Sequence, residues 1–216
     1  MDINILLFGD DKVGKTSTGN LILNYKGLRN INFSNETGDP ICNYATTEDF
    51  PGKFITVIDT PGVRLSRTRV IDAIKQQKNE FLSRRGTFSV LFVVRANRVS
   101  DRDCSESIQS FKEVFGRHFS SRSIVVVTHL GGNIDVENLL GYCGTQLKNF
   151  IRERKLQVCF FDTLTSDSDT RKLQVRKLIS MIESEEKTES WNFLGLSAAA
   201  VAAAAIALVA IYAAKQ

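Results

Sequence analysis

The sequence predicts an α/β domain in which a mostly parallel β-sheet is flanked by helices, followed by a C-terminal transmembrane helix. Three observations support this prediction. Short apolar runs alternate with segments of helical periodicity, a glycine-rich segment follows the first run, and the chain ends in an uncharged stretch from Trp191 to Ala214. Strands that alternate with helices are typical of βαβ units, which place their strands in parallel.

Five apolar runs rich in Val, Ile and Phe are the expected strands, at residues 3–9, 54–59, 89–95, 123–130 and 158–162. Near-continuous apolar runs are typical of strands that are buried on both faces. Apolar residues at helical spacing predict helices at 14–25, 69–82, 105–115, 136–154 and 168–185. The polar segment 26–50 has no clear period, so we expect a long loop there, and loops of that length are usually functional.

Length and composition limit the classes of protein to consider. The 216 residues, 43% of them hydrophobic, suit one soluble domain with an appendage. The net charge of +4 is too small to indicate nucleic-acid binding. Arginine clusters on the expected helices are interpreted as solvated faces, with a secondary contribution to anionic membrane binding left open. The four cysteines lack metal-ligand spacing and are expected to be reduced cytosolic thiols, and the N-terminus does not resemble a signal peptide.

The strongest chemical signal is the segment GDDKVGKT, which fits the P-loop pattern GxxxxGK[ST] between an expected strand and an expected helix. Its backbone N–H groups and the helix N-terminus would face phosphate. Lys15 adds positive charge near the β- and γ-phosphates, and Thr16 supplies a hydroxyl ligand for Mg²⁺. The predicted phosphate site comprises Gly9, Asp10, Asp11, Lys12, Val13, Gly14, Lys15, Thr16 and Ser17.

The second signal is the tetrapeptide DTPG at residues 59–62, which ends the second expected strand. The Asp59 carboxylate can hold Mg²⁺ through water, and the Gly62 N–H can sense a γ-phosphate. By itself DTPG is a common turn sequence, because Pro and Gly favour turns. After a P-loop it favours a GTPase-type switch over an adenylate-type kinase, but it does not separate guanine from adenine.

The base-reading segment is less informative, because the usual guanine motif NKxD is missing. The strand at 123–127 is instead followed by THLGGNID. His129 is a candidate for stacking on a purine, and Asp135 or Asp162 could accept hydrogen bonds from its edge. The alternative is that these residues form an ordinary polar exit from a strand.

Four stretches of the sequence carry a resemblance to a known family, and these are GKTSTGNLIL (14–23), VIDTPG (57–62), ANRVSDRDCSES (96–107) and VCFFDT (158–163). They resemble the immunity-associated nucleotide-binding GTPases (GIMAP or IAN proteins), whose avirulence-induced-gene-type G domain is similar to chloroplast-import receptor GTPases and septins. The resemblance implies a G domain over residues 1–182 that binds GTP or GDP with Mg²⁺. In the last stretch, Asp162 stands where the family's guanine motif CxxFNN has its first Asn.

The departures from the family pattern matter for activity. Thr-His at the base-reading segment is similar to the import receptors, which supports His129 as the stacking residue. The Mg²⁺-sensing Thr of the first switch is Thr37, Thr46 or Thr47, with Thr37 preferred. Val63 follows DTPG, and an aliphatic side chain cannot orient water. The sequence shows no other polar group adjoining DTPG, and Asp11 and Lys12 could crowd an arginine from outside, so hydrolysis is expected to be slow.

The leading function is therefore GTP binding with slow hydrolysis, as a membrane-anchored switch or scaffold. The alternative is a GTP-loaded oligomerisation module with negligible hydrolysis, and a third possibility is an ATP-dependent enzyme. Arg98 is the candidate catalytic residue, because it follows a strand on the nucleotide side and matches the arginine that the family is thought to use in trans in a homodimer. Arg64 and Arg95 are its competitors, and pairing of Arg98 with Asp101 or Asp103 is the structural alternative.

The C-terminal region is expected to be a polar linker at 183–190 and a tail anchor at 191–214. The 21 residues from Leu194 to Ala214 span about 31 Å as a helix, which is enough for the hydrocarbon core. Trp191 and Tyr212 lie near its ends, where aromatic residues prefer the interface. The expectation is a single-pass protein with its G domain in the cytosol. The alternative is an Ala-rich soluble helix packed on the domain.

Overall fold

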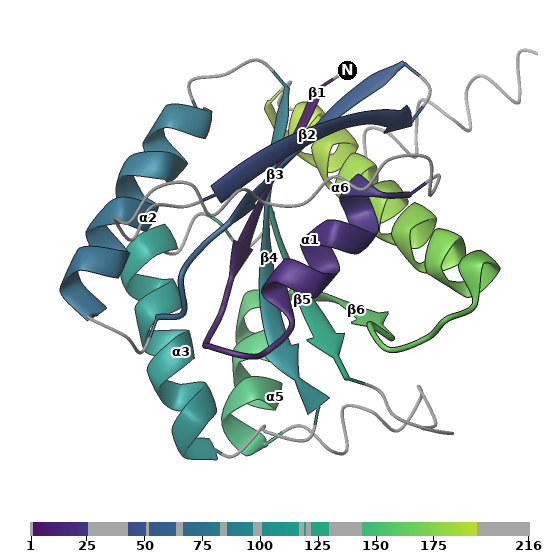
Figure 1. The fold of residues 1–216 in the computed structure, drawn as a ribbon. Helices are drawn as coiled ribbons and strands as arrows, with labels where there is room; N and C mark the ends of the chain where they lie inside the picture. The colour runs from purple at the N-terminus through teal and green to yellow at the C-terminus, as the bar shows by residue number, and fades with distance from the viewer. Residues whose placement is uncertain are drawn as a thin grey trace, which may run out of the picture.

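A computed structural model describes residues 2–25, 43–50, 52–63, 67–82, 86–96, 101–116, 119, 122–129 and 144–193. They form a six-stranded sheet with helices on both faces (Figure 1). The strands are β1 Asp2–Phe8, β2 Asn43–Phe50, β3 Lys53–Asp59, β4 Thr87–Arg95, β5 Ser123–Thr128 and β6 Gln157–Phe161. The helices are α1 Lys15–Leu23, α2 Arg67–Leu82, α3 Asp101–Phe115, α5 Thr145–Arg154 and α6 Ser168–Phe193.

The strand order β2-β3-β1-β4-β5-β6 puts β1 in the interior of the sheet. All neighbouring pairs are parallel except β2 and β3, which are antiparallel. The chain leaves β1 toward β2 and β3 on one side, and then crosses to β4 on the other. This reversal makes the carboxyl end of β1 a topological switch point, where open α/β sheets bind their ligands.

Alternate strand residues feed two separate cores, as the two-residue period of a strand requires. On one face, residues such as Leu6 and Phe92 pack against α2, α3 and α5. On the other face, residues such as Ile5 and Val126 pack against α1 and α6. Figure 1 shows the same division, with α2 and α3 on one side of the sheet and α1 and α6 on the other.

Phe8, the last residue of β1, anchors the strand directly before the glycine-rich loop. Its ring meets Phe111 and Phe115 of α3 edge-on, with ring centroids 5.6 and 5.3 Å apart. Aromatic pairs in this geometry add stability beyond their buried area. The start of the loop is therefore fixed by a rigid core.

The five expected strands are confirmed, with ends within two residues of those predicted. The expectation of one loop over 26–50 is wrong in part, because residues 43–50 form the edge strand β2. Thr47 and Phe50 are buried while Thr46 and Glu48 are exposed, so only one face of β2 contributes to the core. An antiparallel edge strand needs apolar residues on one face only, which explains why the polar composition concealed it.

The helical segments are confirmed where the structure describes them, with three larger differences at their ends. Helix α3 begins at Asp101, earlier than its expected start at residue 105. The described part of α5 begins at Thr145, and residues 136–143 of the expected helix lie outside the described residues. Residues 183–190, expected to be a linker, are helical and continue α6 to Phe193. Their Glu and Lys residues favour helix, and Glu183 forms an ion pair with Lys53 at the start of β3.

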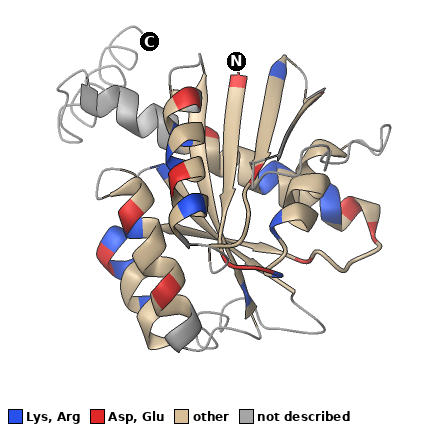
Figure 2. Ribbon diagram, turned by 60° about the vertical axis from the view of Figure 1, so that its left-hand side comes forward, with Lys and Arg blue, Asp and Glu red and all other residues tan. Residues whose placement is uncertain are grey.

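The rest of the predicted tail anchor, residues 194–214, lies outside the described residues. Within the described part of the chain, no helix is long and apolar enough to cross a membrane. Acidic and basic residues are interspersed along the described helices (Figure 2), in keeping with solvated faces. One basic residue also packs, because Arg176 of α6 lies over the ring of Tyr25, which stacks on Phe50 of β2 at 4.3 Å between centroids.

Candidate functional site

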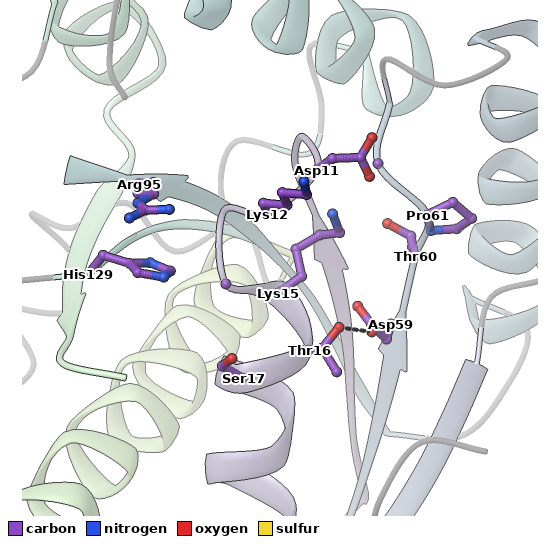
Figure 3. Close-up of a pocket in the computed structure, with 12 residues that line it drawn as sticks. Asp11, Lys12, Lys15, Thr16, Ser17, Asp59, Thr60, Pro61, Arg95 and His129 are labelled. Carbon is purple, nitrogen blue, oxygen red and sulfur yellow. Dashed lines mark hydrogen bonds between the residues drawn. The ribbon is translucent and has the colours of Figure 1, made fainter. Parts of the chain in front are cut away.

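A cavity of about 580 Å³ opens at the carboxyl ends of β1, β3, β4 and β5, next to the N-terminus of α1 (Figure 3). Segments far apart in the sequence meet there because the parallel strands end at the same edge of the sheet. The cavity is lined by Asp11, Lys12, Gly14, Lys15, Thr16, Ser17, Asp59, Thr60, Pro61, Gly62, Arg95 and His129. Figure 3 shows Asp59, Thr60 and Pro61 on one side of the loop and Arg95 and His129 on the other.

The glycine-rich loop runs from the end of β1 to the start of α1, and close packing dictates its first residue. Gly9 has a φ of 152°, and a Cβ atom on it would lie 2.3 Å from the carbonyl oxygen of Val93 on β4. Only glycine fits both the conformation and the contact. Lys12 also has a positive φ of 58°, which turns the loop back over the N-terminus of α1. The loop therefore presents its backbone N–H groups and the helix N-terminus to the cavity.

Lys15 is largely buried and lies at the centre of the site. Its Nζ donates hydrogen bonds to the carbonyl oxygens of Gly9 at 3.2 Å and Asp10 at 2.6 Å. Burial lowers the pKa of Lys15, and the nearby carboxylates of Asp59, Asp11 and Asp10 oppose that shift. A phosphate group in the cavity would add negative charge beside the desolvated ammonium group and so favour its charged form.

Thr16 and Asp59 form a pair suited to a magnesium ion. Thr16 Oγ1 donates a hydrogen bond to Asp59 Oδ2 at 2.6 Å, while Asp59 Oδ1 is buried with no hydrogen-bond partner among the described residues. Burial raises the pKa of the Asp59 carboxyl, against the hydrogen bond from Thr16 and the charge of Lys15. A hydroxyl and a buried carboxylate oxygen are oxygen ligands of the kind that Mg²⁺ takes together with substrate phosphates. The residues present therefore fit the ion.

The segment after β3 is fastened to the floor of the site. Thr60 Oγ1 donates to the carbonyl oxygen of Leu7 on β1 at 2.6 Å, and Val63 N–H donates to Gly9 O at 3.4 Å. The Val63 side chain is buried in the core beneath α2 and α3 and does not line the cavity. Gly62 lies against the glycine-rich loop, because a Cβ atom on it would be 2.7 Å from the backbone nitrogen of Asp11.

Thr128, at the end of β5, ties the base-reading segment to the glycine-rich loop. Its buried Oγ1 donates to the carbonyl oxygen of Val13 at 2.5 Å and lies 3.2 Å from Val94 O and 3.0 Å from His129 Nδ1. A hydroxyl has one proton, so the shortest of these contacts uses it. The next residue, His129, has a φ of 58°, and its Cε1 would be 3.1 Å from a Cβ atom on Gly14. The imidazole is thereby held at the rim of the cavity.

The structure brings most of the predicted site residues together. Lys12, Gly14, Lys15, Thr16 and Ser17 line the cavity with Asp11, Asp59, Gly62 and His129. Three predicted residues shape the loop instead of lining the cavity. Gly9 packs on β4, Asp10 Oδ1 accepts a hydrogen bond from the Asp11 N–H, and the buried Val13 accepts the bond from Thr128.

Other predicted residues are not brought to the cavity. Asp162 follows β6, and its Oδ1 accepts hydrogen bonds from the N–H groups of Leu164 and Thr165, so the carboxylate caps its own loop. Thr46 and Thr47 lie along β2, opposite Thr56 and Ile55, which is several residues from Asp59. The remaining candidates lie outside the described residues, and these are Thr37, Arg64, Arg98 and Asp135.

Sequence reasoning missed three features of this site. From the sequence, Thr128 is only part of a polar strand exit, and Arg95 is only a competitor of Arg98. In the structure Arg95 lines the cavity and pairs with Thr128 in the register of β4 and β5. The expectation that no polar group adjoins DTPG is wrong, because the Asp11 carboxylate contacts Gly62. The first two could have been found from strand pairing, because residues at the ends of adjacent parallel strands share one edge. The third depends on how two loops pack.

The glycine-rich loop between β1 and α1, the Thr16–Asp59 pair and the strand order define a P-loop protein with the GTPase fold. The AIG1 family model matches residues 3–194, which is most of the chain. The chain therefore belongs to the AIG1 family.

Relatives in a plant and in humans match this chain over different shares of their own length. The chain is 29% identical over 195 residues to immune-associated nucleotide-binding protein 1 of Arabidopsis thaliana, covering 83% of this chain and 82% of the relative. It is 28% identical to protein 9 of the same series, covering 85% of this chain and 55% of the relative. It is 26% identical to human GTPase IMAP family member 8, covering 85% of this chain and 27% of that protein.

Solved structures with the same fold include Toc33 of Arabidopsis thaliana in complex with GDP and Mg²⁺. The TM-score is 0.61 at 19% identity, covering 85% of this chain and 84% of Toc33. A second solved structure is described by the statement that dimerization is important for the GTPase activity of the chloroplast translocon components atToc33 and psToc159. Its TM-score is 0.59 at 16% identity, covering 85% of this chain and 82% of the solved chain. These likenesses establish the fold.

Two substitutions of Thr128 should separate the contribution of its hydroxyl to stability from the contribution of its side-chain volume. Thr128→Val keeps the volume but leaves the carbonyl oxygen of Val13 without this donor, and should lower the free energy of unfolding by about 1–3 kcal/mol. Thr128→Ser keeps the hydroxyl and should lower it by less. Urea unfolding of the nucleotide-free protein measures both values. A larger loss in Thr128→Ser than in Thr128→Val would show that the methyl group, and not the hydroxyl, ties β5 to the loop.

Proposed function

We propose that this chain binds guanine nucleotide with Mg²⁺ and hydrolyses GTP slowly, in a reaction that depends on dimerisation, as a membrane-anchored switch or scaffold. The observation that carries nucleotide binding is the Thr16–Asp59 pair at 2.6 Å beside Lys15, at the N-terminus of α1. A hydroxyl, a buried carboxylate and a lysine in this arrangement suit a magnesium-bound phosphate chain.

The relatives support this choice of ligand. Toc33, which shares the fold, has been solved with GDP and Mg²⁺ and with Mg²⁺ and GMPPNP. The plant relatives are described as nucleotide-binding proteins, and the human relative as a GTPase. A guanine nucleotide is therefore favoured over ATP, although the chain has no NKxD motif.

In the bound complex, the backbone of residues 9–16 would surround the β-phosphate, and Lys15 Nζ would exchange its bonds to Gly9 O and Asp10 O for phosphate oxygens. Thr16 Oγ1 and the Asp59 carboxylate would hold Mg²⁺ in its first or second coordination sphere. When bound, the ion neutralises negative charge on the β- and γ-phosphates. Thr37 would complete this set from the first switch.

His129 would contact the base. The imidazole lies beside Gly14, where the base of a nucleotide extends beyond the phosphates, and the bond to Thr128 holds the ring in place. An aromatic face can stack on any purine, so His129 alone does not select guanine. Selection would come from hydrogen bonds to the base edge by Asp135 or by Asp162 after its loop rearranges.

Slow hydrolysis follows from what the site lacks. The Val63 side chain is buried in the core, so it neither orients a water molecule nor enters the cavity. We propose that a second copy of the chain accelerates hydrolysis, with Arg98 of each copy reaching the nucleotide of the other across the nucleotide face. For comparison, dimerization is reported as important for atToc33 and psToc159, and a dimerization-deficient Toc33 variant has an arginine replaced by alanine.

An alternative output is assembly alone, in which the GTP-loaded chain oligomerises and hydrolysis is negligible. The specific observation in its favour is again Val63, which is buried in the core and so cannot orient a water molecule in the cavity. Hydrolysis that rises with protein concentration would favour the leading function, whereas concentration-dependent assembly without turnover would favour the alternative.

Membrane anchoring rests on the sequence of residues 194–214, which continues from the end of α6. This stretch has seven Leu, Ile and Val residues and eleven alanines. The seven branched residues contribute roughly −2 to −4 kcal/mol to insertion, and alanine contributes little. The proposed location is therefore a single-pass tail anchor, with the G domain in the cytosol.

Lys15→Ala and Thr16→Asn should abolish productive nucleotide binding, since the first removes a buried positive charge from the phosphates and the second alters the metal-binding hydroxyl. We expect an affinity loss of at least about a hundredfold for fluorescent GDP in the presence of Mg²⁺. Lys172→Ala on α6 is the matched control and should keep the wild-type affinity. ATP should compete poorly with GDP. Unchanged GDP affinity in both site variants would refute the site assignment, and effective competition by ATP would refute guanine selectivity.

Arg98→Ala should remove the dependence of hydrolysis on protein concentration. A trans-acting arginine can contribute about 10³–10⁵ in rate, so wild-type specific activity should rise with concentration while the variant stays flat at similar GTP affinity. Adding Lys15→Ala protein, which cannot bind nucleotide but retains Arg98, should restore turnover to Arg98→Ala protein. If both proteins show the same concentration dependence, Arg98 is structural and Arg64 or Arg95 becomes the candidate.

The full-length chain should remain with membranes after alkaline carbonate extraction, because a helix over residues 194–214 spans the hydrocarbon core. A chain truncated after Phe193 retains the described fold and should move to the supernatant. Recovery of the full-length chain in the supernatant would instead support an Ala-rich helix that packs on the domain.

A further inference from the structure

The Asp11 carboxylate fills the space between the glycine-rich loop and the segment after β3. A Cβ atom built on Gly62 would lie 1.9 Å from Asp11 Oδ1 and 2.3 Å from its Cγ. In Figure 3, the Asp11 side chain points across the site toward the segment that carries Pro61. The contact therefore joins the tip of the loop to the backbone of Gly62.

Both sides of this contact are fixed by other interactions. The Asp11 N–H donates to Asp10 Oδ1 at 2.8 Å, which holds the tip of the loop. On the opposite side, Thr60 is bonded to Leu7 O at 2.6 Å, and Val63 is packed in the core. The backbone segments on both sides of the carboxylate are thus held in place by the fold.

Gly62 is the residue whose N–H can sense a γ-phosphate, so a terminal phosphate has to fit between the loop and Gly62. The Asp11 carboxylate already lies there. The β-phosphate would be bound by the glycine-rich loop and the N-terminus of α1, so a nucleoside diphosphate would end before it reaches this contact. The two ligands therefore differ in whether they meet the carboxylate.

Charge adds to the steric conflict. Lys15 is the buried cation of the site, and Asp59, Asp11 and Asp10 all act on it, which is seen in the opposing effects on its pKa. Asp59 is paired with Thr16, and Asp10 Oδ1 receives the Asp11 N–H. A γ-phosphate brings further negative charge directly against Asp11, and like charges in contact disfavour a ligand strongly.

We propose that Asp11 is a specificity-determining residue that makes the site prefer a nucleoside diphosphate, because its carboxylate lies where the γ-phosphate of a triphosphate has to fit. The inference rests on the proposed binding of guanine nucleotide. It makes the diphosphate complex the resting form of the protein, and it makes the contact between Asp11 and Gly62 the element that a triphosphate has to open.

The test compares the affinities of fluorescent GDP and fluorescent GMPPNP, both with Mg²⁺, in the full-length protein. Asp11→Asn keeps the size of the side chain and removes its charge, while Asp11→Ala removes both. In each variant the preference for GDP over GMPPNP should fall by at least about tenfold, which corresponds to 1.4 kcal/mol. GDP affinity should change by a smaller factor than GMPPNP affinity in both variants, since the diphosphate does not contact the Asp11 carboxylate.

Asp10→Asn is the matched control, because it removes the same charge one residue earlier and can keep the hydrogen bond to the Asp11 N–H. It should shift both affinities by similar factors and leave their ratio near the wild-type value. An unchanged ratio in both Asp11 variants, or an equal change in Asp10→Asn, would overturn the proposal. If wild-type protein binds neither nucleotide, the proposed function fails first and the inference fails with it. Normal GDP binding with an unchanged ratio would refute only the role of Asp11.

Discussion

The close approach of the glycine-rich loop to its neighbours is the constraint on which the rest of the site depends. Gly9 lies against the carbonyl oxygen of Val93, and Val13 accepts a hydrogen bond from Thr128. These contacts fix the loop to β4 and β5, while Gly62 packs on it from the side of β3. A side chain at Gly9 or Gly62 would push the loop away from the strands. Contacts within the chain thus shape the loop, and a loop held in this way needs less ordering when a ligand binds.

The second organising feature is the balance of charge in a partly desolvated site. The carboxylates of Asp59, Asp11 and Asp10 lie near Lys15. Burial lowers the pKa of Lys15, and the negative charges of these carboxylates oppose that shift. Burial raises the pKa of the Asp59 carboxyl, even though Thr16 donates a hydrogen bond to it. Each group would gain from a ligand of opposite charge, the lysine from phosphate and the carboxylate from a divalent cation. The site is therefore electrostatically incomplete in a way that a magnesium–nucleotide complex would satisfy.

The same fold bears on the proposed separation of nucleotide binding from hydrolysis. The groups suited to binding lie on rigid elements, at the start of α1 and the end of β3. The residue after DTPG, Val63, is committed to the hydrophobic core, where it helps to hold α2 on the sheet. A side chain that stabilises the core cannot also orient a water molecule. In the proposed function, hydrolysis would therefore depend on groups brought from elsewhere, which would link turnover to assembly.

The sequence by itself determined the five buried strands, most of the helices, and the placement of Lys15, Thr16 and Asp59, because each has a local signature of periodicity or spacing. It could not show that residues 43–50 pair as an edge strand, since a strand buried on one face needs few apolar residues. Only the tertiary structure decided that Thr128 bonds to Val13, 115 residues earlier, that Arg95 faces the cavity, and that Asp11 meets Gly62 while Asp162 caps its own loop. These contacts join segments that are distant along the chain, and they are set by how strand ends and loops converge at one edge of the sheet. No local pattern of residues records that convergence.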